Sequence, residues 1–374
     1  MSEYPSESVH LTSTHRPFDT RVFQKECKTL AREGIQVTLV VPHEEDQVHE
    51  NVQIRAIPKP ATGKERLKKT TRDVYKAALK ENKKAIFHFH DSELLPHMLL
   101  LKLRGRRVIY DAHEDTPRQI KYQHWIPDKL KGPVTLFMRV LESLAGRFFD
   151  RIIVAEPIIA SNFKRDNTTL LHNYPILAEF EPCHAIPYES RPMHIGFAGG
   201  ISEVRGIKEV VKAMGLLNAV PNARLIMAGA FYPDALKTEV EHYDGWQRVD
   251  FKGWVGRAEV QQILGNARVG VITRHPIERH LTAMPTKLFE YMAAGLPVVA
   301  SDLPTIRPIV ETHRCGLLVD PLDPVDIARA LSYLLEHPEE AKEMGDRGFQ
   351  AVRDHFSWDV EQRKLLNLYR DLEA

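Results

Sequence analysis

The fold is decided by one stretch of sequence, Met284-Pro285-Thr286-Lys287-Leu288-Phe289-Glu290-Tyr291-Met292-Ala293-Ala294-Gly295-Leu296-Pro297-Val298-Val299-Ala300-Ser301. Pro285 suits the turn that enters a helix, and Gly295 suits the left-handed residue that ends one. The β-branched pair at 298–299 is typical of a strand buried on both faces. The stretch therefore predicts a loop, a short helix, a glycine stop and a buried strand, which is one unit of a wound α/β domain.

The same alternation of short apolar runs and amphipathic segments extends through most of the chain. It predicts parallel sheets that are covered by helices on both faces. The expected strands are 8–13, 35–41, 52–57, 85–89, 107–110, 151–155, 194–198, 224–228, 249–252, 269–273, 298–301 and 317–319. The expected helices are 18–33, 65–82, 93–103, 134–149, 207–218, 258–264, 287–294, 324–336, 339–355 and 358–372.

The alternation stops at residues 173–192, which contain four prolines and which we interpret as a linker. We predict an N-terminal domain at 1–180, a C-terminal domain at 181–356 and a terminal helix at 357–374. Both domains are expected to be Rossmann-like, doubly wound parallel sheets that face a cleft. Such sheets bind ligands beyond the carboxyl ends of their strands, so we expect the site there.

Composition argues against several classes of protein. The net charge of +1 does not suit a strongly basic nucleic-acid binder. No run of about 18 apolar residues could span a membrane, and the first residues lack the pattern of a signal peptide. The three cysteines lie far apart and form no CxxC pair, as in proteins of a reducing cytoplasm. We expect a cytoplasmic globular protein without a nucleic-acid partner.

Two segments of the C-terminal half carry residue types that bind phosphate. Backbone N–H groups at 286–288 would form an anion site at a helix N-terminus, and Lys287 would add positive charge. One turn further, the Glu290 carboxylate could accept hydrogen bonds from a ribose diol. Gly199 and Gly200 follow an expected strand and would let backbone approach a phosphate closely. The residues alone leave a solvated Lys–Glu pair and a plain tight turn as alternatives.

Residues 284–301 resemble the donor-binding signature of the retaining glycosyltransferases of family four, which have the B-type two-domain fold. The resemblance implies that Glu290 contacts the ribose of a nucleotide sugar. The family's first glutamate, which contacts the donor sugar, corresponds to Thr282 here, and Glu278 or His280 lies near enough in sequence to replace it. The implied donor-binding residues are Gly199, Gly200, Arg205, Thr282, Pro285, Thr286, Lys287, Leu288 and Glu290.

Residues 195–207 resemble the first loop of the family's second domain. Arg205 matches a lysine that binds the pyrophosphate, whereas Gly200 stands where the family has an arginine. Arg205 and Lys287 are therefore expected to offset the charge of the leaving diphosphate, which a divalent ion does in other glycosyltransferases. The resemblance extends to 316–321 and to the terminal helix, which in this fold crosses back to the first domain.

In the N-terminal half, His90 and Asp91 end one expected strand, and His113 and Glu114 end the next. These four residues should meet at one edge of the sheet. Histidines and carboxylates together can bind a metal, and solvated loop residues are another interpretation. The resemblance favours a third, in which His113 matches a histidine that contacts the donor sugar and the reaction centre.

The loop after the first expected strand contains His15, Asp19 and Arg21. Asp19 could simply cap the following helix. The functional interpretation is contact of His15 and Arg21 with the acceptor or a phosphate. The expected acceptor side comprises His15, Asp19, Arg21, His90, Asp91 and Glu114.

The resemblance implies transfer of a hexosyl group, with retention, from a UDP- or GDP-linked sugar to a saccharide or lipid-linked acceptor. His113, Arg205 and Lys287 are the expected catalytic residues, and no metal or other cofactor is expected. Two alternatives are a nucleotide-sugar epimerase of the same fold and a non-catalytic subunit that binds nucleotide sugar. The acceptor-side domain is the N-terminal one, and the C-terminal domain binds the donor.

A basic segment, Gly63–Lys84, carries nine positive and three negative residues. Such a run is usually a solvated helix. Its place in the acceptor-side domain also suits docking on an anionic membrane surface, with apolar contact added by 122–127 and 136–138. The protein is then expected to be peripheral on the inner face of the cell membrane.

Overall fold

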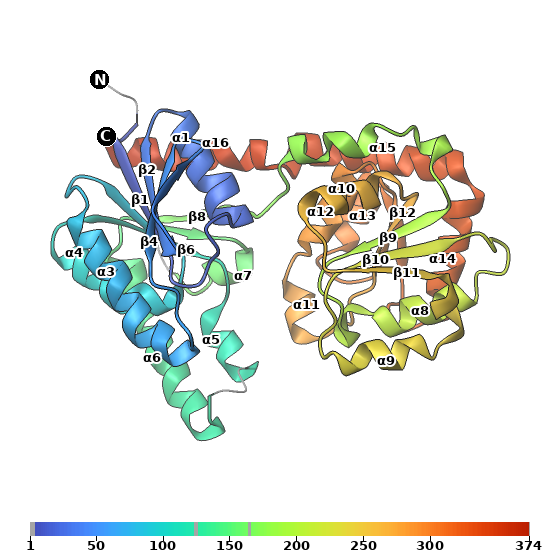
Figure 1. The fold of residues 1–374 in the computed structure, drawn as a ribbon, viewed down its shortest axis with the longest axis horizontal. Helices are drawn as coiled ribbons and strands as arrows, with labels where there is room; N and C mark the ends of the chain where they lie inside the picture. Colours follow the sequence, from blue (N-terminus) through green and yellow to red (C-terminus); the bar gives the residue numbers. More distant parts are fainter. Residues whose placement is uncertain (1–3, 123–125, 164–165, 374) are drawn as a thin grey trace. The chain divides into compact units, whose positions relative to one another are not determined.

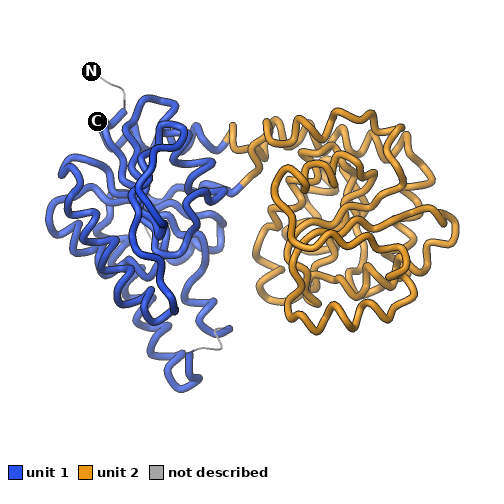
Figure 2. Tube along the Cα trace, in the orientation of Figure 1, with its two compact units in different colours: residues 1–173, 361–374 blue, residues 174–360 orange. Residues whose placement is uncertain are grey.

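The computed structural model describes residues 4–122, 126–163 and 166–373 of the chain. They form two compact units, which are Met1–Asn173 with Glu361–Ala374, and Tyr174–Val360 (Figure 2). Each unit is a doubly wound α/β domain built on a mainly parallel sheet, so the predicted fold class is confirmed. Within the described ranges, no helix has the length and apolarity needed to cross a bilayer.

The sheet of unit 1 has eight strands, and its edge pair β3–β4 is antiparallel while the other neighbours are parallel (Figure 1). In spatial order they are β3 (Gln47–His49), β4 (Val52–Ile57), β2 (Gln36–Pro42), β1 (Glu7–Leu11), β5 (Ile86–Phe89), β6 (Arg107–Ala112), β7 (Arg151–Val154) and β8 (Thr168–Leu170).

The two faces of this sheet differ because successive side chains of a strand point to opposite sides. Val9 and Leu11 of β1 face the apolar core under α3 (Thr71–Lys80), α4 (Leu95–Leu103) and α6 (Asp128–Phe148). Ser8 and His10 face the other way. There they meet Tyr369 of the terminal helix α16 (Trp358–Glu373), whose residues from Glu361 onward belong to unit 1.

The remaining helical segments of unit 1 are short. They are η1 (Thr20–Cys27), α1 (Lys28–Arg32), α2 (Gly63–Glu65), η2 (Arg66–Thr70), η3 (Ser92–Leu94), α5 (Thr116–Gln119), η4 (Ile120–Tyr122) and α7 (Pro157–Ala160).

The sheet of unit 2 has six parallel strands. In spatial order they are β11 (Val249–Gly253), β10 (Arg224–Ala228), β9 (His194–Ala198), β12 (Val269–Ile272), β13 (Val298–Ser301) and β14 (Gly316–Val319). One face packs on α8 (Ile207–Gly215), α9 (Ala235–Glu241) and α14 (Pro324–Glu336). The other packs on α10 (Arg257–Gly265), α12 (Thr286–Ala293), α13 (Arg307–His313) and α15 (Pro338–His355). The short segments are η5 (Leu177–His184), η6 (Tyr188–Ser190), η7 (Glu203–Arg205), η8 (Asp244–Arg248) and α11 (Glu278–Thr282).

The expected strands occur within about two residues of their predicted ends, whereas some other segments differ. The interpretation of 173–192 as a linker is wrong, because Phe180, Cys183 and Tyr188 are buried in the cores of unit 2. Helices α9 and α13 and the strands β3 and β8 were not expected. Their sequences are short, and burial against neighbours stabilises them more than any local pattern does.

Each unit has a point where the winding of the sheet reverses. In unit 1 it lies between β1 and β5, and in unit 2 between β9 and β12. Ligands of doubly wound sheets bind beyond the carboxyl ends of the strands at this reversal. The loops that follow these four strands contain most of the predicted site residues.

Candidate functional site

Asp91, directly after β5, organises the loop that follows β1. Its Oδ2 atom accepts hydrogen bonds from the Ser13 amide at 2.6 Å and the Thr12 hydroxyl at 2.7 Å. Its Oδ1 atom lies 3.3 Å from Nδ1 of His15. Burial raises the pKa of Asp91, but the hydrogen bonds and charge of His15, together with the hydroxyl of Thr14, outweigh it and leave the pKa well below its usual value. Asp91 is therefore an ionised carboxylate that fixes the position of His15.

His113 is held in place by a buried ion pair. Its Nε2 atom lies 2.6 Å from Oδ2 of Asp111, which is fully buried. Asp111 accepts two further hydrogen bonds from Arg21, at 3.0 and 2.8 Å. Burial raises the pKa of Asp111, but Arg21 and His113 outweigh it and hold the pKa well below its usual value. Because an ionised carboxylate only accepts hydrogen bonds, Nε2 of His113 carries a proton and donates it to Asp111.

A cluster of buried histidines lies behind His113. Nδ1 of His10 is 3.0 Å from Nε2 of His90, and Nδ1 of His88 is 3.0 Å from the Tyr369 hydroxyl. Burial lowers the pKa of His90 to about 4 and takes the pKa values of His10 and His88 well below their usual range. These three imidazoles are neutral at neutral pH.

Two groups of side chains bring atoms that could ligate a metal ion within 4.8 Å of one another. One group is Glu26, His10, His88 and His90, and the other is Glu26, His90, Asp111 and His113. Arg21 lies against both carboxylates and places a positive charge beside either group, with its Nε atom 3.1 Å from Glu26. The rings of His10, His88 and His90 lie at interplanar angles of 17° to 41°, and Nδ1 of His10 already forms a hydrogen bond with Nε2 of His90. This geometry suits a hydrogen-bonded network better than a metal centre.

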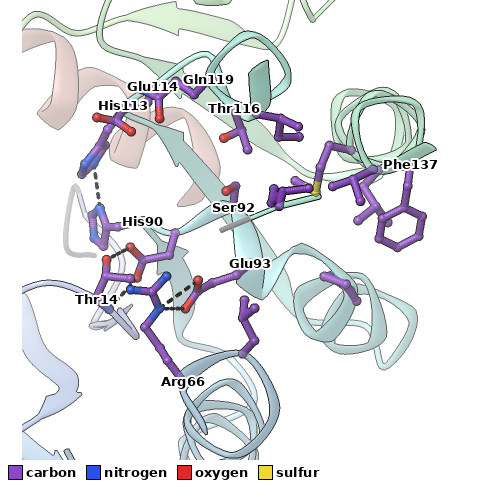
Figure 3. A pocket seen from close by; sticks show the side chains of 18 of the residues that line it. Thr14, Arg66, His90, Ser92, Glu93, His113, Glu114, Thr116, Gln119 and Phe137 are labelled. Atoms are coloured by element: carbon purple, nitrogen blue, oxygen red, sulfur yellow. Dashed lines mark hydrogen bonds and ion pairs between the residues drawn. The ribbon is translucent and has the colours of Figure 1, made fainter. Parts of the chain in front are cut away.

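The expected acceptor-side residues separate into two groups. His15, His90, Asp91 and Glu114 line a cavity of about 760 Å³ in unit 1, together with His113, the expected catalytic histidine (Figure 3). Asp19 and Arg21 are not among its lining residues.

The structure favours another role for these two. Asp19 caps η1 by accepting hydrogen bonds from the Arg21 and Val22 amides at 2.8 and 2.9 Å. The expected contact of Arg21 with a ligand is corrected, because its guanidinium is buried against Asp111, Glu26 and the Leu171 carbonyl. Its sequence position in a polar loop did not reveal this burial.

In unit 2, Lys287 and Glu290 lie at the first turn of α12 with Nζ and Oε2 2.6 Å apart. Gly199 follows β9 with a φ of 141°, a conformation that favours glycine. A Cβ atom on Gly199 would lie 3.1 Å from Cε of Lys287. The glycine therefore allows the lysine to cross the end of β9, and both parts of the predicted donor site meet there.

Arg205 lies on the same side of unit 2, where Nη1 donates to the Gly200 carbonyl at 2.8 Å. Desolvation and the neighbouring charge of Arg279 lower the pKa of Arg205. Neither arginine forms an ion pair with another described residue, so the positive charge of Arg279 acts on Arg205 without an acidic partner beside either of them. Sequence analysis missed Arg279, although it lies between Glu278 and His280, which were considered.

Three further residues that were considered for the nucleotide-sugar site form hydrogen bonds within unit 2. Thr282 is exposed, and its hydroxyl bonds weakly to the Glu278 carbonyl at 3.4 Å. His280 is buried and bonds through Nδ1 to the His275 carbonyl at 2.9 Å. The expectation of a free amide at Leu288 is corrected, because it donates to the Pro285 carbonyl at 3.1 Å. The tight first turn of α12 accounts for that bond, so any anion contact there is left to Thr286 and Lys287.

The basic segment forms α2, η2 and α3, with most of its cations exposed. Arg66 is an exception because its guanidinium pairs with Glu93 at 3.1 Å. Of the expected apolar contacts, Tyr122, Leu136 and Phe137 are exposed, and Ile126, Pro127, Phe137 and Met138 line the cavity. Gln123, His124 and Trp125 lie outside the described residues.

Two family models match the chain, one in each half. Residues 20–173 match "Glycosyltransferase Family 4", and residues 187–351 match "Glycosyl transferases group 1". A D-inositol 3-phosphate glycosyltransferase of Corynebacterium diphtheriae is 28% identical over 199 residues, which are 50% of this chain and 44% of the relative. An uncharacterized glycosyltransferase of Methanocaldococcus jannaschii is 26% identical over 175 residues, which are 46% of this chain and 44% of the relative. These alignments thus span less than half of either relative.

Solved structures resemble the chain over nearly its whole length. Sucrose-phosphate synthase from Thermosynechococcus elongatus superposes with a TM-score of 0.74 and 19% identity, covering 98% of this chain and 99% of the other. An Anabaena protein in complex with UDP-glucose superposes with a TM-score of 0.71 and 13% identity. The match covers 96% of this chain and 98% of the other. At these identities the likeness establishes the fold.

Proposed function

Because this chain belongs to the family-four glycosyltransferases with the B-type fold, we propose that it moves a hexosyl group from a nucleotide sugar to a hydroxyl of a saccharide or lipid-linked acceptor. The anomeric configuration is retained. The C1–diphosphate bond breaks, a bond from C1 to the acceptor oxygen forms, and the acceptor proton passes to the leaving diphosphate.

The observation that carries this proposal is the set of groups at the carboxyl ends of β9 and β12. Arg205 and Arg279 are adjacent cations without acidic partners, and Lys287 crosses Gly199 beside them. A diphosphate would relieve the repulsion between the two arginines. Glu290, released from Lys287 by the diphosphate, would accept hydrogen bonds from the ribose hydroxyls.

These cations also give a reason for the expected independence from divalent metal. A glycosyltransferase must stabilise the negative charge that develops on the leaving diphosphate. Three positive side chains, from η7, α11 and α12, would supply that stabilisation without an ion. Transfer that proceeds undiminished in excess chelator would agree with this part of the proposal, and loss restored by Mg²⁺ or Mn²⁺ would contradict it.

On the side of unit 1, His113 is the proposed catalytic histidine. Its Nε2 atom donates to Asp111, which leaves Nδ1 as the ring nitrogen for a ligand, and the residue lines the cavity. We propose that it receives a hydrogen bond from a hydroxyl of the transferred sugar near the reaction centre. Such a bond orients the sugar without requiring a change in the charge of the histidine.

The proposal is tested by thermal-shift measurements with UDP-, GDP-, ADP- and TDP-sugars on the purified chain. The correct donor at 100 times its Kd should stabilise the protein by about 2.7 kcal/mol, and Glu290→Gln should lose most of that gain. Glu311→Gln is the matched control, because Glu311 forms a similar exposed pair with Arg307 in the same unit. Absence of stabilisation by every nucleotide sugar would contradict donor binding.

A donor-only incubation separates the alternatives. An epimerase would release an altered sugar or nucleotide sugar without an acceptor, and a binding subunit would leave the donor unchanged even when acceptors are supplied. With a competent acceptor, the anomeric coupling in the NMR spectrum of the product reports retention or inversion directly.

A further inference from the structure

The cavity of unit 1 is chemically divided. His113, Glu114, Gln119 and Glu93 lie at one end, and Phe137 lies at the other (Figure 3). Its volume of about 760 Å³ falls within the range of roughly 300–1,000 Å³ that small-molecule sites occupy.

The polar end suits a saccharide. Carboxylates and a neutral imidazole nitrogen accept hydrogen bonds from hydroxyl groups, and the Gln119 amide can both donate and accept. Glu93 is already ordered by the Ser13 hydroxyl at 2.7 Å and by Arg66. A hydroxyl-rich head group at this end would lie beside the proposed catalytic histidine.

The other end has a different chemistry. Helix α6 contributes an apolar wall of five side chains, which are Leu130, Val134, Phe137, Met138 and Leu141. A free saccharide has no use for such a wall, because the hydroxyls on its rim would lose water without gaining partners. A hydrocarbon chain would gain free energy roughly in proportion to the apolar area that it buries there.

The apolar surface of α6 also continues beyond the cavity. Leu136, Val140, Leu144 and Phe148 are 36% to 64% exposed, and none of them lines the cavity. A helix that exposes this much apolar surface is expected to meet an apolar partner. Only the part of a long hydrocarbon tail that extends beyond the cavity would meet this surface.

We propose that the cavity binds the acceptor as a glycolipid, with its saccharide head at His113 and its hydrocarbon tail along α6. This inference rests on the proposed function, and it narrows the acceptor class from saccharides in general to saccharides that carry an apolar tail.

The test measures binding of two model acceptors to the full chain by isothermal titration calorimetry, without any donor. The probes are methyl glucoside and octyl glucoside, the latter kept below its micelle concentration, so that they share a head and differ in the tail. The octyl compound should bind the unmodified protein at least about tenfold more tightly, since its chain buries apolar area on α6. Phe137→Glu should remove that advantage, because it puts a charge in the path of the tail.

Leu136→Glu is the matched control, since Leu136 is the preceding residue of the same helix, is 64% exposed and lies outside the cavity. It should keep the advantage of the octyl compound. Equal binding of the two glucosides to the unmodified protein would overturn the inference. Equal loss in both variants would also overturn it, because it would indicate adsorption on the outer surface of α6.

Failure of this inference can be told from failure of the proposed function. If the unmodified protein transfers sugar to a tail-free saccharide and binds the two glucosides equally well, the glycosyltransferase activity stands and the glycolipid assignment falls.

Discussion

Nε2 of His113 lies 2.6 Å from Oδ2 of Asp111, whose carboxylate also accepts two hydrogen bonds from the buried guanidinium of Arg21. The three side chains come from β6, the loop after it and η1. The buried ion pair between Arg21 and Asp111 thus fixes the orientation of the His113 ring. The ionised carboxylate of Asp111 therefore holds His113 through Nε2.

Replacing Asp111 by Asn should release His113 from this orientation. An amide can donate as well as accept, so the proton of His113 would no longer be confined to Nε2. We expect turnover to fall about tenfold to a hundredfold, the cost of one hydrogen bond to a charged group of roughly 1.5–3 kcal/mol. The measurements are kcat and the ¹⁵N chemical shifts of the His113 ring, which report its tautomer.

The control for Asp111→Asn is Asp150→Asn. Asp150 accepts two bonds from Lys102, at 2.6 and 2.7 Å, and one from the Val108 amide at the opposite end of β6. The Asp150→Asn variant should be less stable than the unmodified protein, but the ¹⁵N chemical shifts of its His113 ring should not change. An unchanged His113 tautomer in Asp111→Asn would contradict the assigned role.

Arg279 should contribute to turnover although no sequence motif identified it. Arg279→Ala removes one of the two adjacent cations, and kcat/KM for the donor should fall about tenfold, equal to about 1.4 kcal/mol. Arg279→Lys should restore part of the loss, because the charge returns without the planar guanidinium. Arg307→Ala, which removes an exposed cation paired with Asp302 and Glu311, should have no effect. Full activity of Arg279→Ala would exclude it from the donor site.

Acid should destabilise the protein through the buried histidines. The pKa of His90 in the folded chain is about 4, below its usual 6.5, so folding disfavours its charged form. The associated stability is present above about pH 6.5 and is lost as the pH falls toward 4, by up to about 3 kcal/mol. Urea denaturation at pH 7 and pH 5 measures this loss.

Comparison with His90→Gln isolates the contribution of His90 to the loss of stability in acid. Such a comparison is needed because Glu142 changes the stability with pH in the opposite direction. Burial raises the pKa of Glu142 to about 8, so its ionisation costs stability as the pH rises. The unmodified protein should lose more stability between pH 7 and pH 5 than His90→Gln does. An identical loss in the two proteins would show that His90 is not responsible.

Anionic vesicles should bind the exposed cations of Gly63–Lys84. The triple variant Lys68→Glu, Arg72→Glu and Lys76→Glu should abolish co-sedimentation at low salt, since each cation near the surface adds about 1 kcal/mol. The same reversals at Arg329, Lys342 and Arg347 in unit 2 serve as the control and should leave binding intact. No sedimentation of the unmodified protein at low salt would dismiss the idea of a membrane partner.

Local pattern was enough to predict much of the fold. Strands β4, β9, β10 and β13 begin and end where the sequence predicts, because their apolar runs and their flanking turn residues lie next to one another along the chain. The helix at 287–294 and its glycine stop were predicted for the same reason. The meeting of His90, Asp91 and His113 at one sheet edge also followed, since parallel neighbours share their carboxyl ends.

The sequence by itself thus determined the two wound domains and which loops carry chemistry, since those depend on residues a few positions apart. Only the tertiary structure decided that Arg21 is buried against Asp111, 90 positions away, and that Arg279 adjoins Arg205. The free-energy cost of burying a charge depends on the partners that folding brings next to it. Such partners are distant in sequence, so the local hydrophobic pattern does not predict them.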